Sequence, residues 1–326
     1  MLIIRRPHTN PFFNIAAEEY ILKAFDDDVF MLWQNEPSII VGKHQNTLAE
    51  INYQFVKENR IPVVRRISGG GTVFHDLGNL NFSFIRKGEK GKLVDFKRFT
   101  DPIVEVLNEM GVPAKFEGKN DLRVNGLKIS GNAEHVFKNR VLHHGTLLFS
   151  SDLNYLNRAI NVKEGKFKDR AVKSNRSKVS NISDFLKTEI PIQEFKEKII
   201  DFIFRKNRTS AFHSFTEKDI FEIGKLVAEK YSTWKWNYGY SPKYSLQNSV
   251  NTKNGLVGFK LEVKNGIIAS LKITGEIINV KQAVTIENLL KGAPHNDISV
   301  RNILQNEWGK ANEEWLTIPA VLEGLF

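Results

Sequence analysis

The chain of 326 residues is long enough to bury a sizeable core and to form one to three domains. Its 41% hydrophobic and 26% charged residues are ordinary for a globular protein, and no run of about 18 apolar residues predicts a membrane span. The sequence contains no cysteine, which excludes disulfides, thiolate metal sites and a cysteine nucleophile.

The formal net charge of +10 points to an anionic partner, which could be a nucleic acid, a membrane surface or an acidic protein. The basic residues are spread along the chain, and they are not interleaved with stacking aromatics in a recognised nucleic-acid module. We therefore expect no nucleic acid and no membrane as partner. The N-terminal residues 1–7 have too few apolar residues for a secretory signal, so we expect a cytoplasmic protein.

Helical and strand-like patterns are interleaved through the first two thirds of the chain. Apolar periodicity predicts helices over 15–25, 52–58, 97–110, 191–205 and 216–231. Strand patterns cover 29–33, 38–41, 63–67, 80–85, 122–129 and 142–149. Because many strand pairs read as hairpins, the pattern favours an α+β fold with a mixed sheet over a doubly wound parallel sheet.

The last third predicts a second, smaller domain. Gly, Ser, Pro and Asn accumulate over 237–254, which is typical of a linker. Strand patterns on either side of Asn265-Gly266 then predict a hairpin, and helical patterns follow over 280–290 and 296–305. We expect domains over 1–244 and 245–326.

The three glycines Gly69 to Gly71 lie between strand-like segments and follow Arg65 and Arg66. Without Cβ atoms, their backbone N–H groups can be approached closely by an anionic ligand. The fork of an arginine side chain suits phosphate or carboxylate. The segment predicts either an anion-binding loop or a glycine-rich turn with solvated arginines.

Asn125-Gly126, flanked by alternating residues, predicts a two-residue hairpin turn. In this register the apolar residues share one face and the polar residues share the other. The predicted cross-strand pairs are Val124 with Leu127, Arg123 with Lys128, and Leu122 with Ile129.

The same register sets two cations, Arg123 and Lys128, opposite one another, which is unfavourable unless they splay into water or an anion lies near. The small residues Ser130 and Gly131 follow the lysine on its strand. A lysine on a rigid strand, aimed at a glycine-rich loop, is suited to neutralising a reacting phosphate.

Two further segments carry polar groups. His143 and His144 begin an apolar strand and must point to opposite faces, so they cannot chelate one metal; we expect one to line a pocket and the other to be structural. Residues 168–178 hold five cations and one carboxylate without periodicity, which predicts a basic loop that orders on a ligand, or a solvated surface.

Together these segments resemble the motifs of lipoate–protein ligases, in the same order over essentially the whole chain. The matching segments are Phe13–Glu19, Arg65–Asn79, Asn120–Leu122, Lys128–Gly131, His143–Leu148 and Trp234–Gly239. The resemblance implies a biotin/lipoate ligase-type catalytic domain with a small α+β accessory domain. It also implies a two-step reaction, in which lipoate and ATP give lipoyl-AMP and pyrophosphate, and the lipoyl group then passes to a lysine of a carrier domain.

The resemblance also implies roles for particular residues. Lys128 is expected to contact the acyl-adenylate and to be catalytic. Expected ATP or adenylate contacts are Arg66, Gly70, Gly71, Thr72, Val73, Phe74, Asn79, Asp121 and Lys128. Expected lipoyl contacts are Glu18, Trp33, Arg66, His75, Lys128, Ser130 and His144. Asp121 is a candidate for binding Mg²⁺ or orienting the incoming lysine, and equally for pairing with Arg123 or Lys128.

The implied cofactors and substrates are ATP, Mg²⁺ and lipoate, with a monomeric enzyme acting on acidic lipoyl carrier domains of 2-oxoacid dehydrogenase complexes or the glycine cleavage H protein. An octanoyl- or lipoyl-transferase of the same fold that works through a cysteine thioester is chemically excluded, because the chain has no cysteine. A biotin ligase fits the motifs less well. A non-catalytic acyl- or nucleotide-binding module is disfavoured by Lys128 and the glycine loop.

Overall fold

The structure is a computed structural model that describes residues 1–89, 91, 93–160, 165–175, 177–207, 209–275, 279–307 and 315–326. These residues form two compact units. The first comprises Met1–Lys43, Ile61–Ala159 and Ser174–Thr233, and the second His44–Arg60, Ile160–Lys173 and Trp234–Phe326. The functional boundary between 244 and 245 stays a prediction. Within the described ranges, no helix combines the length and apolar character needed to cross a bilayer.

The first unit is built on a mixed eight-stranded sheet in the order β12-β1-β2-β6-β10-β9-β8-β7. Strand β1 pairs in parallel with β12 and β2, and the other neighbours are antiparallel. The strands are β1 Leu2–Arg5, β2 Val29–Trp33, β6 Asn79–Lys87, β7 Lys115–Glu117, β8 Asp121–Val124, β9 Leu127–Phe137, β10 Arg140–Leu148 and β12 Ala211–His213. The expected α+β fold with a mixed sheet is confirmed.

A second, three-stranded sheet in the order β4-β3-β5 carries the glycine segment. Its strands are β3 Ser38–Val41, β4 Val63–Arg65 and β5 Val73–His75. The loop from Arg66 to Thr72 therefore connects β4 to β5.

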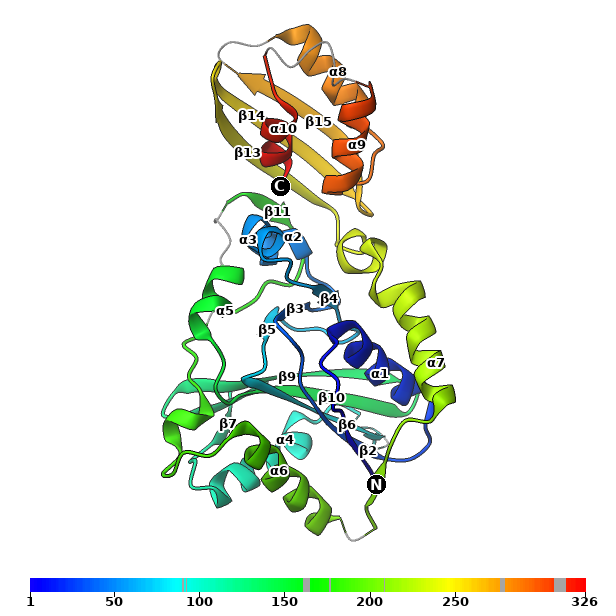
Figure 1. Cartoon of the computed structure of the whole chain (residues 1–326), viewed down its shortest axis with the longest axis vertical. Helices are drawn as coiled ribbons and strands as arrows, with labels where there is room; N and C mark the ends of the chain where they lie inside the picture. The colour runs from blue at the N-terminus through cyan, green and yellow to red at the C-terminus, as the bar shows by residue number, and fades with distance from the viewer. Residues whose placement is uncertain are drawn as a thin grey trace. The chain divides into compact units, whose positions relative to one another are not determined.

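Helices cover both faces of the large sheet (Figure 1). The helices of this unit are α1 Pro11–Ala24, α4 Phe96–Glu109, α5 Leu153–Ala159, α6 Ile192–Lys206 and α7 Glu217–Leu226, with a 3₁₀ turn at Ile182–Phe185 and a π-helical turn at Val227–Tyr231. Helices α4 and α6 pack on an apolar face that includes Leu80, Phe82 and Phe84 of β6. Helix α1 and the small sheet lie on the other face, where Glu18 contacts Ser83.

Helix α1 begins four residues before its predicted start. Asn10 is its N-cap and accepts a hydrogen bond from the Phe13 N–H, while Pro11 occupies the first turn. The cap signal, rather than the apolar periodicity, marks this helix end.

Polar and apolar residues alternate along β6, so this strand contacts two different environments. The polar residues are Asn79, Asn81 and Ser83, and the apolar residues are Leu80, Phe82 and Phe84. Successive side chains of a strand point to opposite faces. The apolar set enters the core, and the polar set faces α1 and the small sheet.

The neighbouring strand β10 approaches this core closely at Gly145. A Cβ there would lie 2.1 Å from Oδ1 of Asn132 and 2.6 Å from the ring of Phe82. We expect Gly145→Ala to lower the free energy of unfolding by about 1–3 kcal/mol, because overpacking forces the neighbours to move. Urea titration of the purified variant measures this change. Gly224→Ala in α7, where a Cβ meets no atom within 4 Å, is the control and should be neutral or stabilising.

The predicted hairpin of β8 and β9 is present, with both Asn125 (φ 51°) and Gly126 (φ 79°) in the left-handed region that the two-residue turn requires. The pairs Val124–Leu127 and Arg123–Lys128 are confirmed. The third predicted pair is wrong, since the register shifts between Leu122 and Arg123 and sets Leu122 opposite Ser130. The extra residue is a β-bulge, which turn chemistry at the hairpin tip does not encode.

The second unit contains a four-stranded sheet in the order β11-β13-β14-β15. Its elements are α2 Thr47–Glu50, α3 Tyr53–Glu58, β11 Phe167–Asp169, β13 Tyr244–Thr252, β14 Gly255–Lys264, β15 Ile267–Gly275, α8 Val280–Leu290, α9 Asp297–Glu307 and α10 Ile318–Leu325, with a π-helical turn at Lys235–Gly239. The hairpin at Asn265-Gly266 is confirmed.

The predicted linker over 237–254 is wrong, because half of it is strand β13, Tyr244–Thr252. Tyr244, Leu246 and Val250 of this strand are buried, while polar residues alternate with them. The polar positions gave the segment the composition of a loop, although their alternation is that of a strand with one face exposed.

Candidate active site

The candidate site lies on the face of the large sheet that carries α1 and the three-stranded sheet (Figure 1). Cross-strand register sets its floor. His144 of β10 pairs with Ser83 of β6 and with Ala133 of β9. One step along, Thr146 pairs with Asn81, which in turn pairs with Trp33 of β2.

The glycine loop lies directly over this floor. Gly70 adopts φ +85°, and a Cβ on it would lie 3.9 Å from the Cβ of Ala133. A Cβ on Gly131, two residues earlier on the same strand, would lie 3.1 Å from Nζ of Lys128. Residues two apart on a strand share a face and are about 7 Å apart. The glycine loop therefore lies against Ala133 of β9, and the Lys128 ammonium lies against Gly131, two residues away on the same strand.

The buried side chain of Arg66 stabilises the glycine loop by hydrogen bonds. Its guanidinium donates to the carbonyls of Gly69 and Gly71 at 2.6 and 2.7 Å, to the Ile40 carbonyl, and to the hydroxyl of Ser68. Burial lowers the pKa of Arg66 to about 10, with Glu18 acting in the opposite direction. Arg66 stays a cation near neutral pH and shapes the loop that was predicted to bind an anion.

The sequence suggested that Arg65 and Arg66 would be exposed beside the glycine loop, but both side chains are buried. Arg65 is fully buried and donates to the carbonyls of Gly42 and Lys43, and Arg66 is 5% exposed. Long cations are drawn inward here because the ends of β3 and the glycine loop present clustered carbonyls that need donors.

The segment after Lys173 contacts both halves of the site. The Thr72 N–H donates to Oγ of Ser174 at 2.8 Å. Further along, backbone bonds join Lys128 to Lys178 and Ser180. The part of the predicted basic loop from Ser174 onward is therefore placed on the glycine loop and on the Lys128 strand. The prediction of a loop is wrong for Lys168 and Asp169, which belong to strand β11 of the second unit and owe that conformation to pairing with β13. Arg176 lies outside the described residues.

Lys128 is held by a single carboxylate. Asp121 accepts from Nζ of Lys128 and from the guanidinium of Arg123, each at 2.8 Å. The anion that the like-charged pair required is thus supplied by the hairpin itself. The Lys128 side chain is 23% exposed.

A hydrogen-bonded chain continues from Arg66 beneath the loop. Arg66 can only donate, so the hydroxyl oxygen of Ser68 accepts from it. The Ser68 hydroxyl in turn donates its proton to Nε2 of His144, 2.6 Å away. Nδ1–H of His144 then donates to both oxygens of Glu18 at 2.9 Å.

Glu18 also accepts a hydrogen bond from the other side of the site. It accepts from the hydroxyl of Ser83, which accepts from Nε1–H of Trp33 at 2.8 Å. One buried carboxylate therefore orients groups on both sides of the site, and the predicted residues Glu18, Trp33, Arg66 and His144 form one connected set.

The other histidine of the pair, His143, points to the opposite face of the sheet, as expected. His143 is buried against Glu134, with Nδ1 and the carboxylate 2.8 Å apart, and stacks on Phe82 and Phe99. Burial lowers the pKa of His143, with Glu134 opposing this. It is a structural residue.

His75 lies edge-on to Trp33, and its Nδ1 accepts from the side chain of Asn35 at 3.1 Å. Nε2 therefore carries the proton, and this buried atom has no hydrogen-bond partner. Burial first, and then Arg66 and His144, lower the pKa of His75 to about 3. The imidazole is neutral at physiological pH.

This shift predicts a stability effect. Because the folded pKa lies below the unfolded value of 6.5, the unfolded state binds more protons between pH 6.5 and 3, and stability is lost as pH falls through that window. We expect the wild type to lose up to about 1.4 kcal/mol per pH unit more than His75→Gln. Urea titrations of both proteins at pH 7, 6 and 5 measure this; parallel slopes would contradict it.

The other predicted residues lie around the same floor. Ser130 is buried and accepts from Asn132, and Asn79 begins β6. Phe74 is 2% exposed and packs on Tyr155, so only its backbone faces the loop. Beside it, Val73 is only partly buried on β5.

Sequence reasoning missed Ser68, Ser83 and Asn81. The first lies inside the glycine motif, and the other two form the polar period of β6, so alternation along that strand was the available signal.

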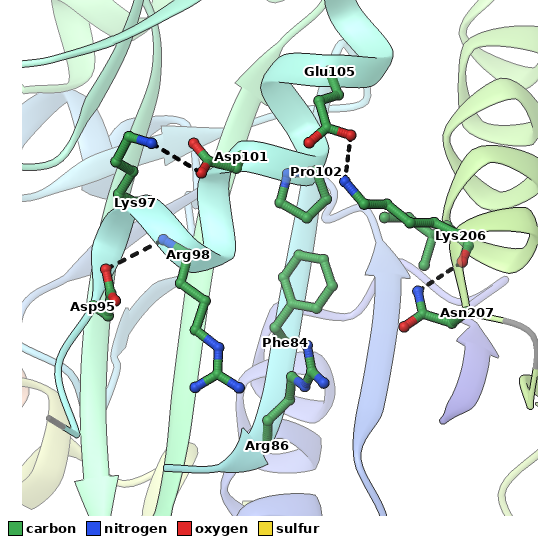
Figure 2. Close-up of a pocket in the computed structure, with 11 residues that line it drawn as sticks. Phe84, Arg86, Asp95, Lys97, Arg98, Asp101, Pro102, Glu105, Lys206 and Asn207 are labelled. Atoms are coloured by element: carbon green, nitrogen blue, oxygen red, sulfur yellow. Dashed lines mark hydrogen bonds and ion pairs between the residues drawn. The ribbon is translucent and has the colours of Figure 1, made fainter. Parts of the chain in front are cut away.

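A separate cavity of about 560 Å³ lies on the opposite face of the sheet, between β6, α4 and α6. Figure 2 shows the charged side chains that line it, among them Lys97 paired with Asp101 and Lys206 paired with Glu105. The two arginines of this cavity, Arg86 and Arg98, pair with Asp28 and Glu89. These mutual pairs neutralise the cavity, which contains none of the predicted site residues.

Residues 10–204 match the family model of the lipoyl protein ligase A/B catalytic domain, and residues 241–316 match that of the bacterial lipoate protein ligase C-terminus. The chain is 43% identical over 310 residues to lipoate-protein ligase LplJ of Bacillus subtilis, covering 94% of each chain.

Two solved structures are similar. The bi-partite lipoate protein ligase of Thermoplasma acidophilum, described with its E2 lipoyl domain, has a TM-score of 0.63 at 28% identity, covering 73% of this chain and 96% of that one. Lipoate-protein ligase A bound with ATP has a TM-score of 0.62 at 28% identity, covering 73% and 98%.

Proposed function

The chain belongs to the lipoate–protein ligase family, and we propose that it activates lipoate with ATP and transfers the lipoyl group to a lysine of a carrier domain. The single observation that carries the proposal is the placement of Lys128 Nζ and the glycine loop over neighbouring positions of β9. A cation and the backbone of a glycine-rich loop thereby lie at two neighbouring positions of one strand.

This arrangement suits attack of a carboxylate on the α-phosphate. An oxygen of the carboxylate forms a bond to phosphorus, the bond from that phosphorus to the bridging oxygen breaks, and pyrophosphate leaves. Negative charge on the phosphoryl oxygens is stabilised by Lys128 and by glycine-loop N–H groups, each donor contributing about 2.7–4 kcal/mol.

The second step needs no covalent enzyme intermediate. The neutral amine nitrogen of the incoming lysine attacks the acyl carbon, the carbon–oxygen bond to AMP breaks so that AMP leaves, and the nitrogen releases one proton to solvent. The absence of cysteine agrees with this route. Thr72 gives its N–H to Ser174 in this structure, so we propose that a phosphate oxygen replaces the Ser174 hydroxyl when the nucleotide binds.

The sequence made Asp121 a candidate for binding Mg²⁺ and equally for pairing with Arg123 or Lys128, and the structure shows the pairing. Both of its carboxylate oxygens are within 2.8 Å of a cation, Lys128 or Arg123. Among the described residues, no three His, Cys, Asp or Glu side chains converge. We assign Asp121 to orienting Lys128 and route no step through a metal.

We propose an acidic lipoyl domain as the partner. The related archaeal ligase is described with its E2 lipoyl domain, and the net charge of +10 favours encounter with an acidic protein. The glycine cleavage H protein as acceptor, a monomeric state and a cytoplasmic location stay predictions.

The test is an ATP–pyrophosphate exchange assay with lipoate, octanoate and biotin in parallel, followed by transfer to a purified lipoyl domain. We expect exchange with lipoate and none with biotin, and mass spectrometry should show one lipoyl group on the carrier lysine. Exchange with biotin, or none with lipoate, would refute the assignment.

A further inference from the structure

A cluster of basic side chains lies where α1 and the turn after α7 meet β9. Glu19 of α1 accepts from Nζ of Lys23 at 2.5 Å and from Nζ of Lys230 at 2.6 Å, so both ammonium groups converge on one carboxylate. The hydroxyl of Tyr231 donates to the same carboxylate. Burial acts to raise the pKa of Glu19, but the bonds from the two lysines and the tyrosine lower it, so the group is an anion. Lys23 also lies over the ring of Phe137 on β9, with Nζ 5.5 Å from the ring centroid.

Two further basic residues, Lys43 and His135, border this cluster. The backbone N–H of Lys43 donates to the Ser68 carbonyl at 2.9 Å, which places Lys43 beside the glycine loop. His135 belongs to β9. Burial lowers the pKa of His135 and of Lys230, and repulsion by Lys43 adds to both shifts. The Lys43 ammonium is therefore near both groups, and the His135 imidazole is neutral at physiological pH.

The cluster carries more positive than negative charge. Lys23, Lys43 and Lys230 face one carboxylate, because the neighbouring Glu18 is bonded to Ser83 and His144 instead. Within the part of the chain that the structure describes, no carboxylate lies within ion-pair distance of the Lys43 ammonium. Like charges held close together cost free energy unless an anion joins them. The excess positive charge therefore indicates an anionic ligand.

A π-helical turn over Val227–Tyr231 fixes two of the groups. Adjacent side chains of an α-helix point about 100° apart, yet here Lys230 and Tyr231 both reach Glu19. Turns of this kind are rare and occur frequently at functional sites. The turn thus holds the Lys230 ammonium in a fixed position on this face.

Strand β9 relates the cluster to the reacting groups. Residues two apart on a strand share a face and are about 7 Å apart. The Lys128 ammonium lies against Gly131, the glycine loop lies against Ala133, and His135 is the next residue on that face. The glycine loop therefore lies between Lys128 and the basic cluster.

We propose that Lys23, Lys43 and Lys230 bind the two outer phosphates of ATP and hold them as pyrophosphate when the bond to the α-phosphorus breaks. The inference rests on the proposed function and adds which residues receive the leaving group. With the α-phosphate at Lys128 and the glycine loop, the outer phosphates extend to the next step of β9. Pyrophosphate carries more negative charge than lipoate or AMP, and lysine ammonium groups suit it because each offers three donors on a flexible stem. They also stabilise the charge that develops on the bridging oxygen.

The first test measures KM for pyrophosphate in the ATP–pyrophosphate exchange assay. Lys43→Met removes an ammonium that no described carboxylate pairs with, so the fold should be unaffected. We expect KM for pyrophosphate to rise about tenfold, the scale of one hydrogen bond to a charged group, while KM for lipoate stays unchanged. Lys225→Met, at an exposed position of α7, is the matched control and should change neither value. An unchanged KM for pyrophosphate in Lys43→Met would overturn the inference.

A second measurement omits pyrophosphate altogether. Transfer from synthetic lipoyl-AMP to a purified lipoyl domain contains only the second step, so Lys43→Met should match the wild-type rate. An equal loss in transfer and in exchange would assign the cluster to the carrier domain and overturn its role in binding pyrophosphate. Failure of the wild type to catalyse exchange with any acid would instead refute the proposed function itself.

Discussion

Lys128→Ala is expected to reduce lipoate-dependent ATP–pyrophosphate exchange by about 10³-fold or to below detection, while the fold survives. The loss reflects removal of a donor aimed at charge that develops on the α-phosphate, where one such donor is worth about 10²–10³ in kcat. Lys128 is also a cation, so the upper end of that range applies.

The fold should tolerate this change because the Lys128 side chain is partly exposed and its backbone bonds are unaffected. Circular dichroism and the urea midpoint measure that. Lys115→Ala, at an exposed position of β7 paired with Arg123, is the matched control and should keep full exchange. Normal exchange by Lys128→Ala would remove this residue from the mechanism.

Glu18→Gln is expected to lower kcat/KM for exchange by about 10²-fold, the scale seen when a group that positions the reacting partners is displaced. The carboxylate accepts from both Ser83 and His144, and an amide turns one of those acceptors into a donor. Oε1 accepts from both groups, whereas Oε2 accepts from His144 alone, so an NH₂ at the Oε2 position sets a donor against Nδ1–H of His144. We expect this conflict to favour the other tautomer of His144, which takes the acceptor away from the hydroxyl of Ser68. The chain that supports Arg66 and the glycine loop is thereby broken.

The neighbouring Glu19→Gln separates this effect from general loss of stability. Glu19 is also buried on α1, but it accepts from Lys23, Lys230 and Tyr231 instead of the chain to His144. It should cost stability without changing the tautomer of His144, which nitrogen NMR reports directly. If both variants lose equal activity with the His144 tautomer unchanged, Glu18 has no positioning role.

Local chemistry explains the features that could be predicted from the sequence. The Asn125-Gly126 turn needs only two residues with positive φ, so its position and the Arg123–Lys128 pairing follow from four neighbouring residues. Strands β2 and β3 have the predicted bounds because their apolar runs end at turn residues. The exclusion of a cysteine mechanism follows from composition alone.

Long-range partners explain the failures. The bulge between Leu122 and Arg123 and the strand β13 within the supposed linker depend on neighbours that the local pattern does not contain. The directions of Arg65 and Arg66 are likewise decided by carbonyls of β3 and of the glycine loop, which surround them only after folding.

The sequence by itself determined the class of chemistry, because the glycine loop and the hairpin lysine each lie in a few consecutive residues and the missing cysteine follows from the whole composition. Only the tertiary structure decided which groups share the site. Glu18, Ser68, Ser83 and His144 come from separate segments, and their hydrogen bonds exist because α1, the glycine loop and two strands of the sheet bring them within 3 Å. Burial then leaves the donors of His75 and Asn81 unmatched, a property that no stretch of sequence could reveal.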